Sequence, residues 1–312
     1  MEMKKIATRE SYGKCLVDIA GEFPNMVVLD ADLTGATKTN LFKKAHPQRH
    51  INCGIAESNM MGVAAGLAAE GLIPVVSSFA MFAAGRAYEQ VRNSVGYPHL
   101  NVKIAATHGG ISVGEDGASH QCCEDIALMR TIPGMVVVNP SDDVEARAAL
   151  RAALEHDGPV YLRFGRMAVP VYNKEEDYRF ELGKGVLLRE GRDVTLIATG
   201  LCVWEALRAA DRLAGEGIDA EVINIHTIKP IDSALIAQSV KKTGRAAAIE
   251  EHSIIGGLGD AVADVLCREC PAPLKKIGVP DVYGQSGSAA ELVRHYGLGE
   301  AEIAAAVVNW MK

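Results

Sequence analysis

Short apolar runs alternate with helical patterns along most of the chain, and this alternation predicts the fold class. In the first half, strands are predicted at 26–29, 51–53, 73–77, 102–106, 135–138 and 160–164. Apolar residues at helical spacing separate these runs, most clearly over 83–95 and 143–155. Short apolar strands that alternate with helices are typical of a mostly parallel sheet covered on both faces.

A polar, proline-containing segment at 168–184 predicts a linker. A second alternating set follows it, with strands predicted at 194–198, 220–225, 246–249 and 276–279, and helices at 203–214, 233–240, 260–268 and from 300 onward. A length of 312 residues suits two domains. We therefore expect two three-layer α/β domains with mostly parallel sheets, one over 1–167 and the other over 185–312.

Composition and charge narrow the function classes. A formal net charge of -7 argues against a nucleic-acid partner, which requires clustered Lys and Arg. The apolar stretch 62–85 could span a bilayer by length, but Glu70 and Pro74 interrupt it, so a buried helix and strand are expected instead of a membrane span. The first ten residues do not form a signal peptide. These features indicate a cytoplasmic protein.

Seven cysteines, an odd number, favour a reducing compartment over a disulfide framework. Cys267 and Cys270 have the spacing of a zinc or redox pair. No second pair completes a zinc site, and the two residues close a predicted helix instead of opening one. We expect no metal site within this chain, and the role of the pair stays open.

Glu57 stands where a predicted strand turns into a helix rich in glycine and alanine. The helix dipole stabilises a carboxylate at that position, whereas close packing of small residues raises a carboxyl pKa. Such a glutamate could transfer protons at neutral pH. By position alone, it could equally be a helix-capping residue.

Two further segments carry candidate chemistry. The glycine-rich stretch 107–121 leaves the carboxyl end of a buried strand, where α/β proteins bind ligands, although an ordinary surface loop would have a similar composition. Phe79 and Phe82 lie three residues apart and could line a cofactor pocket or belong to the core. The glycines at 256–259 depart from the dinucleotide-binding pattern at Val262 and favour a structural turn.

These motifs, in this order, resemble those of the transketolase family. The resemblance rests on segments spread over nearly the whole chain, at 7–9, 29–33, 54–66, 78–82, 107–121, 139–142, 227–230, 250–252 and 256–259. It implies a pyrimidine-binding domain followed by a transketolase C-terminal domain. It also implies thiamine diphosphate as the cofactor, and an enzyme of the pentose phosphate pathway.

The resemblance implies roles around the cofactor. Glu57 matches the glutamate that hydrogen-bonds the aminopyrimidine and drives its tautomerisation, so that the cofactor's amino group can take the proton from the thiazolium carbon. Phe79 and Phe82 match the aromatic pocket around the pyrimidine, and Asp32 matches an acid close to the cofactor. Gly85 departs from the pattern, because some members carry a third aromatic residue there.

The resemblance also implies a substrate site. Asp116 and His120 match residues that contact the ketose hydroxyls, and we expect both to contribute to catalysis. Arg9, His108 and Arg163 match the set that binds the sugar phosphate, a task suited to arginine.

The family's diphosphate-binding half, with its Gly-Asp-Gly and downstream Asn that hold Mg²⁺ or Ca²⁺, has no counterpart in this sequence. We therefore expect an N-terminal partner subunit that carries the diphosphate and metal site. Two copies of each chain would form an α2β2 assembly, and activity would require the partner.

The expected reaction is transfer of a two-carbon ketol unit from a ketose phosphate to an aldose phosphate. Alternatives are a two-carbon transferase acting on a branched or sulfonated sugar, a 1-deoxyxylulose-5-phosphate synthase-like enzyme, and the beta subunit of a 2-oxoacid dehydrogenase. A regulatory subunit without catalytic activity is a further alternative. The physiological sugar pair and the identity of the partner are not determined by the sequence.

Overall fold

The computed structural model describes residues 3–312, and the chain divides into two compact units. The first unit comprises the chain up to Gly109 together with Leu128–Leu182, and the second comprises Gly110–Ala127 and Gly183–Lys312. The segment 110–127 therefore packs with the later part of the chain. Inside the predicted linker, β8 (Ala168–Pro170) pairs antiparallel with β1 (Lys5–Ala7). The domain boundaries at 167 and 185 stay a prediction.

The sheet of the first unit runs in the order β6-β7-β5-β4-β2-β3, and each of these neighbouring pairs is parallel. The apolar runs form these strands within a residue or two of their predicted ends. Their bounds are β2 Met26–Asp30, β3 His50–Asn52, β4 Ile73–Phe79, β5 Lys103–Thr107, β6 Val136–Val138 and β7 Val160–Arg163.

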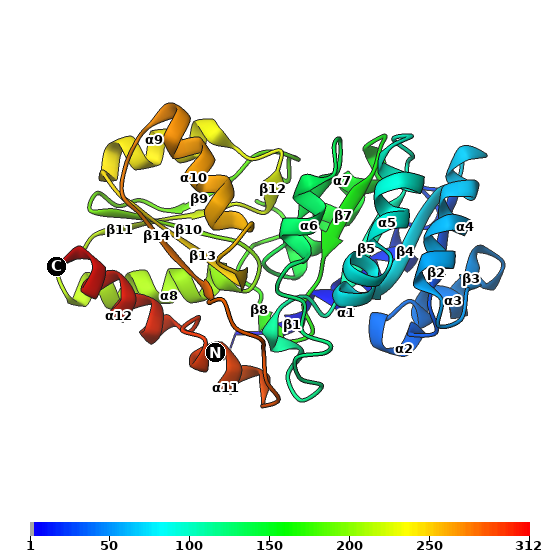
Figure 1. Ribbon diagram of the computed structural model, residues 1–312, viewed down its shortest axis with the longest axis horizontal. Coiled ribbons are helices and arrows are strands. Elements are labelled where there is room, and N and C mark those ends of the chain that lie inside the picture. Colours follow the sequence, from blue (N-terminus) through cyan, green and yellow to red (C-terminus); the bar gives the residue numbers. More distant parts are fainter. Residues whose placement is uncertain (1–2) are drawn as a thin grey trace. The chain divides into compact units, whose positions relative to one another are not determined.

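Helices cover both faces of this sheet (Figure 1). Helices α1 (Thr8–Asp18) and α7 (Asp143–Glu155) pack on the face to which Val75 belongs, in one buried apolar cluster. The next residue, Val76, points to the opposite face because side chains alternate along a strand, and it is also fully buried. Helix α4 (Glu57–Ala69) contacts β4. The predicted three-layer arrangement is confirmed.

The regular helix predicted over 83–95 is wrong in form. Two π-helical stretches, η2 (Met81–Arg86) and η3 (Val91–Gly96), flank the short α5 (Tyr88–Gln90). Wider π turns shift the direction of the following side chains, and they are frequent at functional sites. The remaining helical segments of the first unit and its junction are α2 Thr34–Thr37, α3 Asn40–Ala45, η1 Pro47–Arg49 and α6 Asp125–Thr131.

The second unit has a sheet in the order β14-β13-β10-β11-β9. The pairs are parallel except at β9, an antiparallel edge strand that the apolar pattern did not predict. The strands are β9 Val186–Arg189, β10 Val194–Ala198, β11 Ala220–Asn224, β13 Ala246–Ser253 and β14 Leu274–Val279, and a short β12 spans Thr227–Lys229. Helices are η4 Ile111–Val113, α8 Cys202–Gly215, α9 Ser233–Thr243, α10 Leu258–Glu269, α11 Ala289–His295 and α12 Glu300–Met311.

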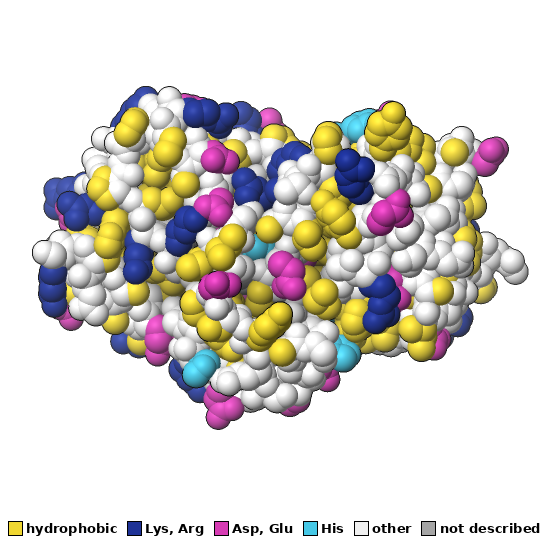
Figure 2. Space-filling model, viewed as in Figure 1, with side chains coloured by type: hydrophobic (Ala, Val, Ile, Leu, Met, Phe, Trp, Pro, Cys, Tyr) yellow, Lys and Arg dark blue, Asp and Glu magenta, His cyan; other side chains and the backbone are white. Residues whose placement is uncertain are grey.

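The surface mixes both signs of charge. On the face drawn in Figure 2, Lys and Arg side chains are interspersed with Asp and Glu, without an extended basic patch among the side chains visible there. Over residues 3–312, no helix has both the length and the apolar content needed to cross a bilayer.

Candidate functional site

Glu57 is the first residue of α4, and its side chain is buried to 2% exposure. The chain reaches it through Gly54, whose φ of +71° is a conformation that favours glycine. The sequence placed Glu57 at the start of this helix, and that position is confirmed. Burial of a carboxylate requires a compensating partner, because an isolated charge is costly to remove from water.

That partner is Arg86, at the end of the π-helical stretch η2. Its Nη1 donates to Glu57 Oε2 at 3.0 Å, and its guanidinium lies over the Phe82 ring, 4.6 Å from the centroid. Arg86 is 53% exposed, so one end of the ion pair faces solvent while the other is enclosed. The arrangement engages one carboxylate oxygen of Glu57 with a cation and sets an aromatic face beside the same guanidinium.

Phe79 forms the centre of an aromatic stack. Its ring centroid lies 5.8 Å from that of Phe82 at an interplanar angle of 14°, and 3.8 Å from the His108 ring at 25°. Phe79 ends β4 and Phe82 belongs to η2, so the two rings are not on one regular helix. The structure thus brings three predicted site residues into contact.

His108 is held in one tautomer by its neighbours. Arg9 Nη1 donates to His108 Nε2 at 3.0 Å, so the ring hydrogen is at Nδ1, which donates to Thr107 Oγ1 at 2.8 Å. His108 has φ +59°, an uncommon conformation for a residue other than glycine. Strained backbone of this kind persists where surrounding contacts impose it, often at functional sites.

The two arginines of the predicted phosphate set lie on the same unit as His108. Arg9 also donates to the Ala36 carbonyl at 3.1 Å, and burial lowers its pKa, with the charge of Arg166 adding to the effect. Arg163, at the end of β7, is 3% exposed. A Cβ on Gly109 would lie 2.6 Å from Arg163 Nε, so the arginine passes directly over a glycine backbone.

Asp32 lies in an exposed turn after β2 and has φ +62°. Its backbone N–H is hydrogen-bonded to Asp30 Oδ1 at 3.0 Å and to Asn52 Oδ1 at 3.1 Å. Asn52 Nδ2 donates back to Asp32 Oδ1 at 3.1 Å. Asp30, fully buried, also accepts from Thr39 Oγ1 at 2.7 Å. The turn that presents Asp32 is therefore fixed by a polar network that the sequence did not reveal.

Asp116 and His120 belong to the second unit, on the segment 110–127. Asp116 is exposed and His120 is partly exposed, and Ser119 Oγ lies 2.9 Å from His120 Nδ1. Gln121 is buried, and its Nε2 donates to the Ile111 carbonyl at 3.1 Å. The segment 110–127 thus has a buried part, held by the hydrogen bond of Gln121, and polar side chains at the surface.

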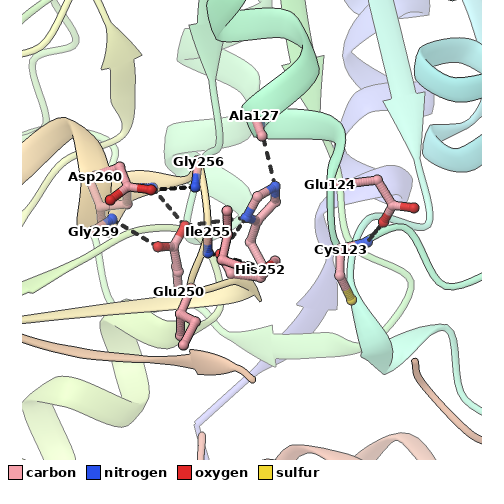
Figure 3. Close-up of polar contacts among 12 residues, drawn as sticks. Cys123, Glu124, Ala127, Glu250, His252, Ile255, Gly256, Gly259 and Asp260 are labelled. Atoms are coloured by element: carbon pink, nitrogen blue, oxygen red, sulfur yellow. Dashed lines mark hydrogen bonds and ion pairs between the residues drawn. The ribbon is translucent and has the colours of Figure 1, made fainter. Parts of the chain in front are cut away.

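The glycines at 256–259 form a structural turn before α10 (Figure 3). The backbone N–H groups at the start of this helix, where an anion could bind, already have a partner. Glu250, 1% exposed, accepts hydrogen bonds from the backbone N–H groups of Leu258 at 2.6 Å and Gly259 at 2.8 Å, at the start of α10. A Cβ on Gly257 would lie 2.0 Å from Glu250 Oε2. An internal carboxylate therefore takes the place that a dinucleotide phosphate occupies at such a helix N-terminus.

The cysteine pair lies at the end of α10, with Cys267 exposed and Cys270 partly exposed, and both are free thiols. Within residues 3–312, no three His, Cys, Asp or Glu side chains are grouped so that they could hold a metal ion.

The sequence did not indicate the ion pair of Arg86 with Glu57, nor the role of Glu250 at the start of α10. Each pairs with a group that is distant in the sequence or across a turn. For Arg86, the available signal was a lone cation shortly after the two phenylalanines. Its contact with Glu57 depends on the π-helical turns, which no regular periodicity indicates.

Two family models match the chain in succession. The transketolase pyrimidine-binding domain matches residues 4–171, and the transketolase C-terminal domain matches residues 183–303. A Methanocaldococcus jannaschii protein, provisionally assigned as a transketolase C-terminal section, is 51% identical over 97% of this chain and 96% of its own length. A Clostridium protein named as a 6-deoxy-6-sulfo-D-fructose transketolase subunit is 46% identical over 95% and 91% of the two chains.

A solved structure described as a split-gene transketolase, in an inactive beta4 tetramer, superposes with a TM-score of 0.90. It is 51% identical in sequence, and the match covers 98% of each chain.

Proposed function

This chain belongs to the transketolase family, and we propose that it is the C-terminal subunit of a split, thiamine diphosphate-dependent enzyme. The reaction proposed is transfer of a two-carbon ketol unit from a ketose phosphate to an aldose phosphate. The observation that carries the proposal is the buried Glu57 carboxylate, which lies at a helix N-terminus and shares the Arg86 guanidinium with the Phe82 ring.

The residues present fit one end of the cofactor. Glu57 offers a carboxyl oxygen that can share a proton with a ring nitrogen, and the stacked Phe79 and Phe82 offer apolar faces for a flat heterocycle. A diphosphate with its divalent cation needs several oxygen ligands, and the part of the chain described here has no suitable group of acids. The proposal therefore includes an N-terminal partner that holds the metal and diphosphate, in an α2β2 assembly.

When bound, thiamine diphosphate supplies the nucleophilic carbon that attacks the ketose carbonyl. Glu57 would hydrogen-bond the aminopyrimidine ring nitrogen through the oxygen that Arg86 leaves available. Asp32 would lie close to the cofactor, as the resemblance implies. The low exposure of the Glu57 side chain limits competition from water for that hydrogen bond.

For the substrate, Arg9 and Arg163 would bind the sugar phosphate with charge-assisted hydrogen bonds. His108, the third residue of the predicted phosphate set, accepts from Arg9 at Nε2 and would hold that guanidinium in position for the phosphate. Asp116 and His120 would contact the ketose hydroxyls from the segment 110–127.

The test is reconstitution with an N-terminal chain that bears the Gly-Asp-Gly and Asn diphosphate motif, assayed with xylulose 5-phosphate and ribose 5-phosphate. Ketol transfer is expected from the complex and not from either chain alone. Glu57→Gln should lower kcat by at least a hundredfold, in the range attributed to positioned proton-transfer groups. Glu70→Gln, an exposed change at the other end of α4, is the matched control. Full activity in the Glu57 variant would reject the assignment.

A sulfonated ketose is a second candidate donor, because a relative that is 46% identical is named as a 6-deoxy-6-sulfo-D-fructose transketolase subunit. Sulfonate and phosphate are both tetrahedral anions that arginine can bind. Comparing kcat/KM for the two ketoses in the reconstituted complex decides between them, and a ratio above about ten in either direction identifies the preferred donor.

A further inference from the structure

The segment 110–127, here called the substrate loop, is attached to the second unit at several points along its length. Near its start, Gly110 N donates to the Cys122 carbonyl at 2.8 Å, which closes the loop on itself. Near its end, Ser253 N donates to the Cys123 carbonyl at 2.7 Å, and Ala127 N donates to His252 Nε2 at 3.3 Å (Figure 3). The end of β13 therefore holds one side of the loop.

Glu251 holds the other side. Its carboxylate is 4% exposed, and Oε1 accepts from the backbone N–H of Ser112 at 2.6 Å, at the start of η4. Gly110 has φ +82°, and a Cβ there would lie 2.3 Å from the Glu251 carboxyl carbon. The carboxylate is thus packed directly onto the loop backbone, which a larger residue than glycine would prevent.

The middle of the loop has a further attachment. Gln121 Nε2 donates to the Gln285 carbonyl at 2.9 Å, and a Cβ on Gly117 would lie 2.6 Å from Ser286 Oγ. Gly117 is next to Asp116, and Gln121 is next to His120. The two proposed substrate residues are therefore each adjacent to a residue that packs against the segment 285–286.

We propose that Glu251 is a positioning residue for the ketose substrate, which acts by fixing the backbone of the loop that carries Asp116 and His120. This proposal rests on the proposed function. With an amide in place of the carboxylate, the N–H of Ser112 would exchange a charge-assisted hydrogen bond for a weaker neutral one, and an N–H2 donor would replace one of the two oxygens packed against the turn at Gly110. The loop would then sample more conformations, and binding would require their restriction.

Glu250 provides a matched control because it precedes Glu251 on the same strand. The two side chains point to opposite faces, and both are buried carboxylates that accept backbone N–H groups. Glu250 caps α10 and approaches the loop through His252, whose Nδ1 lies 3.7 Å from Glu250 Oε2, whereas Glu251 binds the loop backbone directly. A general loss of stability from removing a buried charge on β13 would affect both variants alike.

The experiment compares Glu251→Gln and Glu250→Gln in two measurements. Hydrogen exchange of the full chain should show faster exchange over 110–121 in the Glu251 variant, and over the start of α10 in the Glu250 variant. In the reconstituted complex, Glu251→Gln should raise KM for the ketose on the order of tenfold, with kcat within about twofold. Glu250→Gln should raise KM by less than Glu251→Gln does, because Glu250 approaches the loop through His252.

Unchanged exchange in the loop of the Glu251 variant would overturn the proposal, as would an equal rise of KM in both variants or a normal KM despite a loosened loop. If the unmodified complex shows no ketol transfer, the proposed function fails instead, and hydrogen exchange still decides whether Glu251 holds the loop.

Discussion

Replacing Arg86 with glutamine leaves the buried Glu57 carboxylate without its cation. The two side chains meet at 3.0 Å, with Glu57 2% and Arg86 53% exposed. At an effective dielectric constant near 20, opposite charges about 4 Å apart attract by about 4 kcal/mol. Solvent around the exposed guanidinium screens this attraction toward the range of surface pairs, roughly 0.2–1 kcal/mol. We expect a coupling free energy between these limits, about 1–2 kcal/mol.

A double-mutant cycle isolates that coupling, because it subtracts the effects of each side chain on the rest of the protein. The variants are Arg86→Gln, Glu57→Gln and the double change. Each is compared with the unmodified full chain by thermal unfolding, in which the transition of the first unit is followed. Arg86→Gln alone should lower the melting temperature by roughly 2–4 °C per kcal/mol of lost stability. The double variant should be more stable than the sum of the two single effects predicts.

A coupling below about 0.3 kcal/mol, which is within the error of such cycles, would refute the reasoning. It would mean that Glu57 is compensated by solvent, and that the guanidinium is held mainly by the Phe82 ring. Arg92→Gln serves as the control, since this exposed arginine bonds the neighbouring Asn93 and has no part in the Glu57 pair.

Two further predictions concern the stability of each unit. Burial lowers the pKa of His226 to about 4, so the unfolded chain binds more protons below its ordinary pKa of about 6.5, and stability falls as the pH drops from about 6.5 to 4. His226→Gln should reduce this pH-dependent loss of unfolding free energy by about 3 kcal/mol, from about 1.4 kcal/mol per pKa unit. An identical pH profile in the variant would contradict the prediction. Asp142 caps α7 by accepting from Glu145 N at 2.9 Å, and also accepts from Asn173 N at 2.9 Å. Asp142→Ala should lower the free energy of unfolding by about 2–3 kcal/mol and speed proteolysis near Asn173. Asp142→Asn should retain much of the capping interaction. Equal stability of the two variants would contradict this prediction.

Much of the fold follows from local pattern. Continuous apolar runs such as that of β6 predict strands buried on both faces, because only such strands can lack a polar side. The helix predicted over 143–155 matches α7, because its apolar residues recur at helical spacing. Strand β9 was missed because an edge strand with partly exposed residues lacks that continuous pattern.

The candidate site was predictable only in part. The sequence by itself determined which chemical groups the chain carries, and that Glu57 begins a helix after a strand. Tertiary structure decided that Arg86 neutralises it, because the contact depends on π-helical turns that shift side chains off the regular helical period. It also decided that Glu250 fills a helix N-terminus and that Glu251 holds the substrate loop. The Arg86 and Glu251 pairings join residues far apart in the chain, and the Glu250 pairing crosses a turn. A pattern read along one segment reports burial but not the partner that burial requires.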